Sequence, residues 1–523
     1  MIAVDSAKIA PFIKAVHVIV SFIWAMVAAA MAFVMGASSM SWETMLAVCI
    51  AGVSAYLWSR FGDFWPSLAA CPWPIWPLTV LLVWRLLIGA AGLYPQLASN
   101  AVLRTLPDPL ITAVYLLAGL FIVLVILWLV PWLWQGLSAY LAEIDCFEIV
   151  FFGSLASLLT VLLYITYQLS NGYWSSVDVV FSIDSGIVSE RMLPDPTYAD
   201  LRHPVYSFLF WPLNVWLNDI ASLTPTPVFT YHLLWGISGA WMLLGMSLLL
   251  YRLSGRQRHV ALLYVLTMPV WLFCFFVEKF QPACFLTLLT VAALVGSEYN
   301  RAARWGVAAT GCMTSSAPLL LACLVTRSPR ELAKRSGWLL CSGLGLLAVS
   351  GRLNILLHLP KYWQDVHQFT EIDLTLKDRI YCYFNSVYAC FFPLSHRLYE
   401  GRLYWQSVSQ ELRLMGVVIL VVALLGFIFR CRQRAYRLFF AWLLFQPLFF
   451  IVFAWSPLES PLFTLYFSWA IVPLFCAGLH GLFARFPRLF KVLIALLCSV
   501  LLALNIPQWL YILSLLRQLY PVV

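Results

Sequence analysis

The chain has 523 residues, of which 63% are hydrophobic and only 11% carry a charge, whereas a typical soluble domain has about 25% charged residues. So few charges cannot cover the surface of a soluble protein of this length, which excludes a soluble enzyme or binding module. The net charge of +9 is spread along the chain, so it does not indicate nucleic-acid binding.

Apolar stretches of roughly 20 residues, each able to cross a hydrocarbon core of about 30 Å as a helix, recur from one end of the chain to the other. The first is too long for the core of a signal peptide and has no convincing cleavage site, so it is predicted to be a span. The sequence predicts an all-α polytopic membrane protein with about thirteen transmembrane helices, over residues 12–36, 43–58, 75–93, 109–130, 147–168, 228–252, 260–277, 282–297, 337–357, 412–430, 438–455, 461–479 and 490–512.

One further apolar stretch, residues 308–325, is interrupted by small residues and proline. Gly311, Ser315, Ser316 and Pro318 divide it into two halves. A broken helix occurs within a membrane only where neighbouring protein or water satisfies its free backbone groups. The pattern therefore predicts a re-entrant segment or a pair of half-helices.

Lysine and arginine indicate which loops face the cytoplasm. They gather in five short loops, at 252–258, 301–304, 327–335, 430–437 and 485–491, and the positive-inside rule places all five, with the N-terminus, in the cytoplasm. Residues 204–219 are apolar, but a crossing there would move the first basic loop outside. Their short length and internal Pro212 favour a helix on the outer membrane surface, with Asn214 and Asn218 toward water.

This topology leaves two long outer loops, 169–227 and 358–411. The first contains Asp178, Asp184, Arg202 and His203. Asp184 lies among serines and a glycine, as at a turn or a helix start near the membrane boundary. These residues fit either a functional site or an ordinary solvated loop, in which Arg202 reaches the headgroups and His203 only caps the surface helix.

Charges also occur in two short outer connections. Glu278 and Lys279 separate two predicted spans, and Glu459 lies in a turn between Pro457 and Pro461. A charge at the membrane boundary needs a partner, which suggests a role in binding substrate. A solvated pair is the alternative for Glu278 and Lys279.

The second outer loop combines three histidines with several acids, but their spacing matches no compact set of metal ligands, so no metal site is predicted. Cys382 and Cys390 are in the same loop. They would form a disulfide in an oxidising compartment, and are otherwise expected to be small buried side chains.

The order of these features resembles the multi-spanning glycosyltransferases of the GT-C superfamily. The resemblance extends from Glu148 to the C-terminus. It includes DSGIVSE (184–190), LRHPVYSFLFWPL (201–213), EKFQP (278–282), the broken helix and FAWSPLESPLFTLYFSWAIVP (453–473). It implies a catalytic membrane core over 147–523, preceded by a four-span module, 1–146, to which no role is assigned.

The resemblance also implies a reaction. A sugar on a polyprenyl-phosphate carrier passes to an acceptor hydroxyl on the outer face, with inversion at the anomeric carbon. Asp184 would be the catalytic base, with Asp178 as the alternative. Arg202, His203 and Lys279 would bind the donor phosphate, and Glu278 and Glu459 would bind substrate.

The sugar, the acceptor (glycan, lipid or protein) and any help from a divalent cation stay open. A bacterial inner membrane, with the site on the periplasmic face, is expected. A transporter or lipid flippase is the main alternative, and a non-catalytic assembly subunit is another. Internal repeats, which are usual in transporters, are not evident in the sequence.

Overall fold

The computed structural model describes residues 145–169, 183, 185–195, 198, 202–326, 328–350, 370–371, 373–393, 396–399, 402–405, 409–457 and 462–519. The chain divides into two compact units, Met1–Asp145 and Cys146–Val523, and the described residues other than Asp145 belong to the second. The four spans predicted before residue 147 lie outside the described residues, as do Asp178, Asp184 and Glu459.

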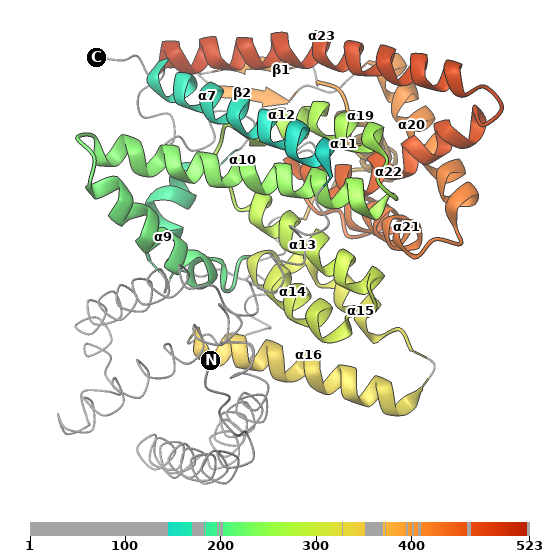
Figure 1. The fold of residues 1–523 in the computed structure, drawn as a ribbon, viewed down its shortest axis with the longest axis horizontal. Coiled ribbons are helices and arrows are strands. Elements are labelled where there is room, and N and C mark those ends of the chain that lie inside the picture. Colours follow the sequence, from blue (N-terminus) through green and yellow to red (C-terminus); the bar gives the residue numbers. More distant parts are fainter. Residues whose placement is uncertain are drawn as a thin grey trace, which may run out of the picture. The chain divides into compact units, whose positions relative to one another are not determined.

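The described part is almost entirely helical, which confirms the predicted class (Figure 1). Its elements are η3 (Glu148–Phe152), α7 (Gly153–Leu169), α8 (Ser185–Ile187), η5 (Val188–Met192), α9 (Tyr206–Ser222), α10 (Pro227–Leu253), α11 (Arg258–Leu266), α12 (Met268–Phe273), α13 (Phe280–Val295), α14 (Tyr299–Cys312), η6 (Thr314–Ser316), α15 (Pro318–Leu324), α16 (Pro329–Val349), α19 (Leu376–Ala389), β1 (His396–Tyr399), β2 (Arg402–Trp405), α20 (Gln410–Arg430), α21 (Arg434–Pro447), η7 (Leu448–Val452), α22 (Thr464–Leu482) and α23 (Pro487–Leu519).

Six helices of the described part are long and apolar enough to cross a membrane. They cover Glu148–Gln168, Pro227–Leu253, Gln410–Arg430, Arg434–Val452, Thr464–Leu482 and Pro487–Leu519. Five of them coincide, to within four residues at either end, with a span predicted from the apolar pattern, and the last, Pro487–Leu519, extends seven residues beyond the predicted end at 512. The protein is therefore a helical membrane protein.

The other three predicted spans in this unit differ from a single long apolar helix. The span expected over 260–277 is two helices, because Thr267 is extended between α11 and α12 and Pro269 occupies the first turn of α12. Residue 269 cannot donate a backbone hydrogen bond to a continuing helix. α13 has 16 residues, and α16 begins at Pro329, earlier than the predicted 337.

The surface stretch predicted at 204–219 is helix α9, which has Pro212 within it. The prediction that Asn214 faces water is wrong: it is 7% exposed. Its side-chain oxygen accepts hydrogen bonds from Tyr231 Oη at 2.6 Å and Trp235 Nε1 at 3.2 Å, both on α10. Asn218 is exposed, as predicted.

Helices α20 and α22 pack closely because glycines remove side chains from their contact. A Cβ on Gly426 would meet the backbone oxygen of Leu474, and one on Gly478 would meet the backbone oxygen of Val422. Such close approach of backbones through small residues is typical of helix packing in membranes. Nearly all of α22 is buried, so it lies at the centre of the unit.

The predicted cytoplasmic loops come together at one end of this unit. Arg434 Nη2 donates to the Tyr299 hydroxyl at 2.9 Å, and the guanidinium of Arg335 lies 3.4 Å from the centre of the same ring. The rings of His259 and His480 both contact Phe490 edge to face. This grouping agrees with a common side for the basic loops, and we call it the basic end.

A buried ion pair joins α10 to η3 at this end. Arg252 Nε lies 2.7 Å from Glu148 Oε1, and its Nη2 lies 3.0 Å from Glu148 Oε2. The Glu148 side chain is 1% exposed and that of Arg252 is 20% exposed. Helix α7, which directly follows η3, and helix α10 run side by side (Figure 1).

The second outer loop contains helix α19 and a two-stranded antiparallel hairpin in which His396 pairs with Trp405. A bridge between Thr370 and Trp455 joins this loop to the turn before α22. Cys382 and Cys390 are free thiols on or next to one helix. The disulfide considered for them is therefore wrong, and the alternative of a buried side chain is confirmed for Cys390.

Candidate functional site

The first outer loop and the broken helix meet, although more than 100 residues separate them. The break lies between α14 and α15, where Met313 is extended. Val205 N donates to Gly311 O at 3.0 Å and Thr314 N donates to Arg202 O at 3.0 Å. These bonds satisfy backbone groups that lose their helical hydrogen bonds at the break. The predicted break is therefore confirmed, and so is the prediction that neighbouring protein satisfies its free backbone groups.

His203 strengthens this contact. Its Nδ1 lies 2.8 Å from the backbone oxygen of Cys312, and because a carbonyl can only accept, Nδ1 carries the proton. His203 is 2% exposed. The interpretation that it caps the surface helix is wrong, since Val205 is the residue before α9 and no side chain caps that helix.

Glu278 and Lys279 form the connection between α12 and α13. They are only 3% and 6% exposed, so the interpretation of a solvated pair is wrong. Glu278 Oε2 accepts a hydrogen bond from Lys279 N at 2.9 Å. Burying two charged groups at a helix end is costly, which points to a requirement other than stability.

Tyr206 connects these two parts of the site. It is 1% exposed, and burial raises its pKa well above the usual value, with Cys312 and Glu278 as further causes. Cys312 precedes the break and Glu278 precedes α13, so the charge state of Tyr206 is coupled to both segments. We use the name outer junction for His203, Tyr206, Glu278, Lys279 and the break at 311–316.

The sequence did not single out Tyr206 because one tyrosine in an apolar stretch has no distinguishing pattern. A cluster of buried hydroxyls was also missed. Thr287 Oγ1 lies 3.2 Å from Ser316 Oγ, and Ser316 also bonds to the Tyr466 hydroxyl. The run Thr314–Ser316 was the available signal. The cluster ties the break to α13 and α22.

The predicted catalytic base is not among the described residues. Asp178, Asp184 and Glu459 lie outside the described residues. Ile183 and Ser185, the described neighbours of Asp184 in the chain, are 1% and 0% exposed. Arg202 is half-buried, and its backbone, as described above, bonds to the break.

The start of α22 is close to the start of α13. Phe463, the residue before α22, contacts Phe280, the first residue of α13, with ring centres 5.7 Å apart. Phe463 also contacts Phe449 and Phe450. The predicted residues therefore fall into three groups: His203, Glu278 and Lys279 are buried, Arg202 is half-buried, and the three acids remain predictions.

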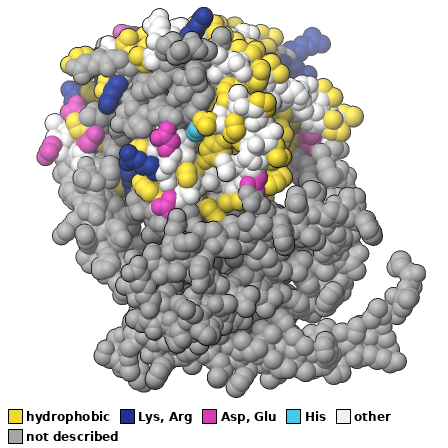
Figure 2. Space-filling model, turned by 90° about the vertical axis from the view of Figure 1, so that its left-hand side faces the viewer, with side chains coloured by type: hydrophobic (Ala, Val, Ile, Leu, Met, Phe, Trp, Pro, Cys, Tyr) yellow, Lys and Arg dark blue, Asp and Glu magenta, His cyan; other side chains and the backbone are white. Residues whose placement is uncertain are grey.

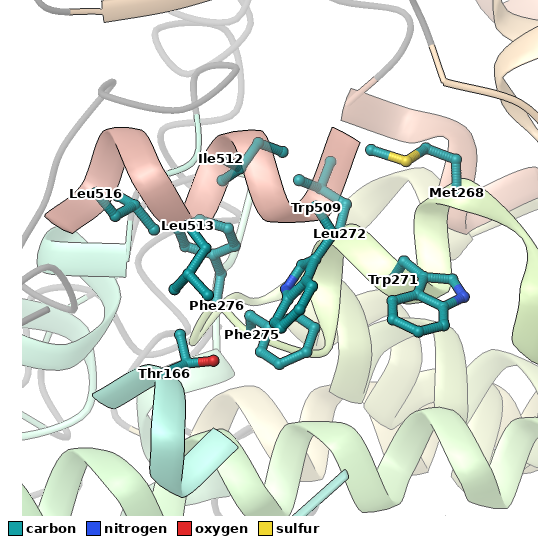
Figure 3. Close-up of a pocket in the computed structure, with 10 residues that line it drawn as sticks. All are labelled: Thr166, Met268, Trp271, Leu272, Phe275, Phe276, Trp509, Ile512, Leu513 and Leu516. Carbon is teal, nitrogen blue, oxygen red and sulfur yellow. The ribbon is translucent and has the colours of Figure 1, made fainter. Parts of the chain in front are cut away.

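A small apolar pocket lies next to the connection that carries Glu278 (Figure 3). Its walls come from the end of α7, from α12 and the residues after it, and from α23. The lining residues are Thr166, Met268, Trp271, Leu272, Phe275, Phe276, Trp509, Ile512, Leu513 and Leu516. Phe276 is two residues before Glu278, so the pocket is close along the chain to the buried charges.

Figure 2 shows the face of the unit on which acidic and basic side chains lie beside a broad apolar area. Within the described ranges, no three His, Cys, Asp or Glu side chains are placed to hold a metal ion. Comparisons with protein-family models, with curated proteins and with solved structures find no match for this chain.

Proposed function

We propose that the chain is a membrane glycosyltransferase of the GT-C type, which moves a sugar from a polyprenyl-phosphate carrier to an acceptor hydroxyl on the outer face of the membrane. One observation carries most of the support: Lys279 and Glu278 are adjacent in the chain and both are buried, at the start of α13. Titratable side chains in membrane segments are rare and generally serve function.

A phosphate on a lipid carrier matches this chemistry. A buried ammonium gains most from an anion, because charge-assisted hydrogen bonds are about twice as strong as neutral ones. Lys279, with His203 and Arg202, would hold the phosphate as negative charge develops on it.

The reaction is a single displacement. The acceptor oxygen bonds to the anomeric carbon while the bond from that carbon to the phosphate oxygen breaks. The bonding electrons leave with the phosphate, and the proton of the acceptor hydroxyl passes to the base, Asp184 or Asp178. One displacement inverts the anomeric carbon and forms no covalent intermediate.

The test is glycan profiling of the cell envelope in a deletion strain that carries wild-type or variant protein. Asp184→Asn should lower transfer by roughly 10²- to 10⁴-fold, as is typical for loss of a general base. Asp373→Asn, which removes an exposed acid in the second outer loop, is the matched control. If only Asp178→Asn abolishes transfer, Asp178 is the base. Full rescue by both variants contradicts the proposal.

A second variant tests the observation itself. Lys279→Gln should weaken transfer while the protein is still made and inserted, whereas Lys377→Gln, on the exposed surface of α19, should not. Measured transfer at rising donor concentration would separate weak donor binding from slow chemistry. Equal activity of Lys279→Gln and wild type would remove the phosphate-binding role.

The broken helix with its hydroxyl cluster is the observation that favours a transporter or lipid flippase, because such proteins bind substrate at interrupted helices. The same deletion strain separates the two functions. A transferase defect leaves one sugar substituent missing from an otherwise complete glycan. A flippase defect instead leaves lipid-linked precursor on the cytoplasmic side.

A further inference from the structure

Two arginines at the basic end converge on one tyrosine. Tyr299 is the first residue of α14. The guanidinium of Arg335, from α16, lies 3.4 Å from its ring centre, and that of Arg434, from α21, lies 5.4 Å from it. Three segments distant in sequence thus bring two positive charges to one aromatic ring.

Both guanidiniums are fixed in place by hydrogen bonds. Arg434 Nη1 donates to Ser297 Oγ at 2.6 Å and Nη2 to the Tyr299 hydroxyl at 2.9 Å. Arg335 Nη1 donates to Val325 O at 2.8 Å, beyond the end of α15. These bonds use only some of the five donors of each guanidinium, so further donors are left for an anion.

Little negative charge offsets this pair. The nearest acid to Arg335 is Glu331, at 3.8 Å from Nε, which is too long for a hydrogen bond, and Arg335 Nε is buried without a hydrogen-bond partner. In the described part of the chain, Arg434 forms no ion pair. The pKa of the Tyr299 hydroxyl is lowered, first by the hydrogen bond from Arg434 and also by Arg335, as expected beside two positive charges.

The surroundings indicate what kind of anion fits. Val325, whose carbonyl holds Arg335, has a side chain that is 75% exposed, and Leu321 on α15 is 68% exposed. Apolar side chains exposed in this way suit acyl chains. Positive charge beside lipid-facing residues at the basic end is the arrangement that recognises anionic headgroups of the cytoplasmic leaflet.

We propose that Arg335 and Arg434, on the ring of Tyr299, form a binding site for the phosphate of an anionic phospholipid. The site is independent of the glycosyltransferase proposal, since it lies at the end of α13 opposite to Glu278 and Lys279. Arg335 would contact the phosphate through the donors not used by Val325, and Arg434 through those not used by Ser297 and Tyr299.

The experiment uses the full chain purified in detergent and placed in nanodiscs of phosphatidylcholine with or without phosphatidylglycerol. Native mass spectrometry counts the retained phosphatidylglycerol, and the thermal midpoint measures its effect on stability. Arg434→Gln should abolish tight retention of one lipid and the rise in midpoint. Arg432→Gln, an exposed arginine in the same turn, is the control and should keep both.

Two further arms make the result specific. Arg434→Lys keeps the charge but loses the planar fork of the guanidinium, and it should retain less lipid than wild type. The same variant is a control for misfolding of Arg434→Gln, because the thermal midpoint of Arg434→Lys in phosphatidylcholine alone should match that of wild type. Inorganic phosphate should not replace the lipid. Equal lipid retention by Arg434→Gln and Arg432→Gln, or full stabilisation by inorganic phosphate, would overturn the proposal.

Discussion

The two ends of α13 differ in how they hold charge. At its start, Glu278 and Lys279 are 3% and 6% exposed. Beyond its end, Arg301 and Glu298 form an ion pair in which the side chains are 38% and 50% exposed. One helix thus separates a region of buried charge from a region where most charge is in water.

The difference in burial determines how each set of charges affects stability. An exposed ion pair contributes about 0.2–1 kcal/mol, so the Arg301–Glu298 pair contributes little to stability. A buried charge costs several kcal/mol in desolvation. The outer junction is therefore the place where a loss of stability is tolerated, as is common at functional sites.

Thiol labelling tests whether the basic end and the outer loops face the sides of the membrane that the charge pattern predicts. Cys431 is an exposed native thiol in the basic turn after α20, and Lys377→Cys would place a thiol on α19. In intact cells an impermeant thiol reagent should label Lys377→Cys and leave Cys431 unlabelled. Permeabilised cells should show both. Cys431→Ser identifies the signal of the native thiol, and the opposite pattern would invert the topology.

The largest effect on stability is expected at the one buried pair described at the basic end. Arg252→Gln leaves Glu148 buried without its partner, which typically costs about 3–5 kcal/mol. Arg301→Gln removes the same group from an exposed pair and should cost no more than about 1 kcal/mol. Thermal or denaturant unfolding in detergent measures both. Similar losses would mean that burial does not distinguish the two pairs.

A smaller effect is expected from His203. His203→Phe removes the hydrogen bond to the Cys312 oxygen and leaves a polar group of the break without that partner, which costs about 1–3 kcal/mol. His396→Phe, in the outer hairpin, is the control. Hydrogen exchange should show faster opening at 311–316 in His203→Phe alone. Unchanged exchange there would show that the backbone bonds of Arg202 and Val205 hold the break by themselves.

The smallest effect concerns pH at the basic end. Burial, and next the nearby His480 and Arg430, lower the pKa of His259 from 6.5 to about 4, so it is neutral in the folded protein near neutral pH. The unfolded chain binds a proton more readily, and stability should fall as pH drops from 6.5 to about 4. His259→Gln should flatten this decline, measured as the thermal midpoint against pH. An unchanged slope would assign the decline to other groups.

Much of the helical pattern followed from apolar length and charge, because both act locally. The helix formed by η3 and α7, Glu148–Gln168, and helix α10 differ from the predicted spans by no more than one residue at either end. The broken helix was predicted from Gly311 and Pro318, which act on their own backbone. The division between α11 and α12 was missed, although Pro269 was a local signal for it.

The outer junction could be predicted only in part, because its contacts join segments far apart in the chain. His203 lies 109 residues from Cys312, and no local pattern pairs them. The predicted orientation of Asn214 was wrong for a related reason: its partners, Tyr231 and Trp235, belong to the next helix. In an apolar helix a single amide indicates that a partner exists, but not on which side it lies.

The contact between Gly426 and Gly478 has a consequence for movement. Because backbone meets backbone there, α20 and α22 cannot rotate about their axes or slide without a clash, and they act as one rigid body. The interrupted helices around Thr267 and Met313, where the backbone is already extended, lack such a constraint. We therefore expect any bending of the unit to occur there and not between α20 and α22.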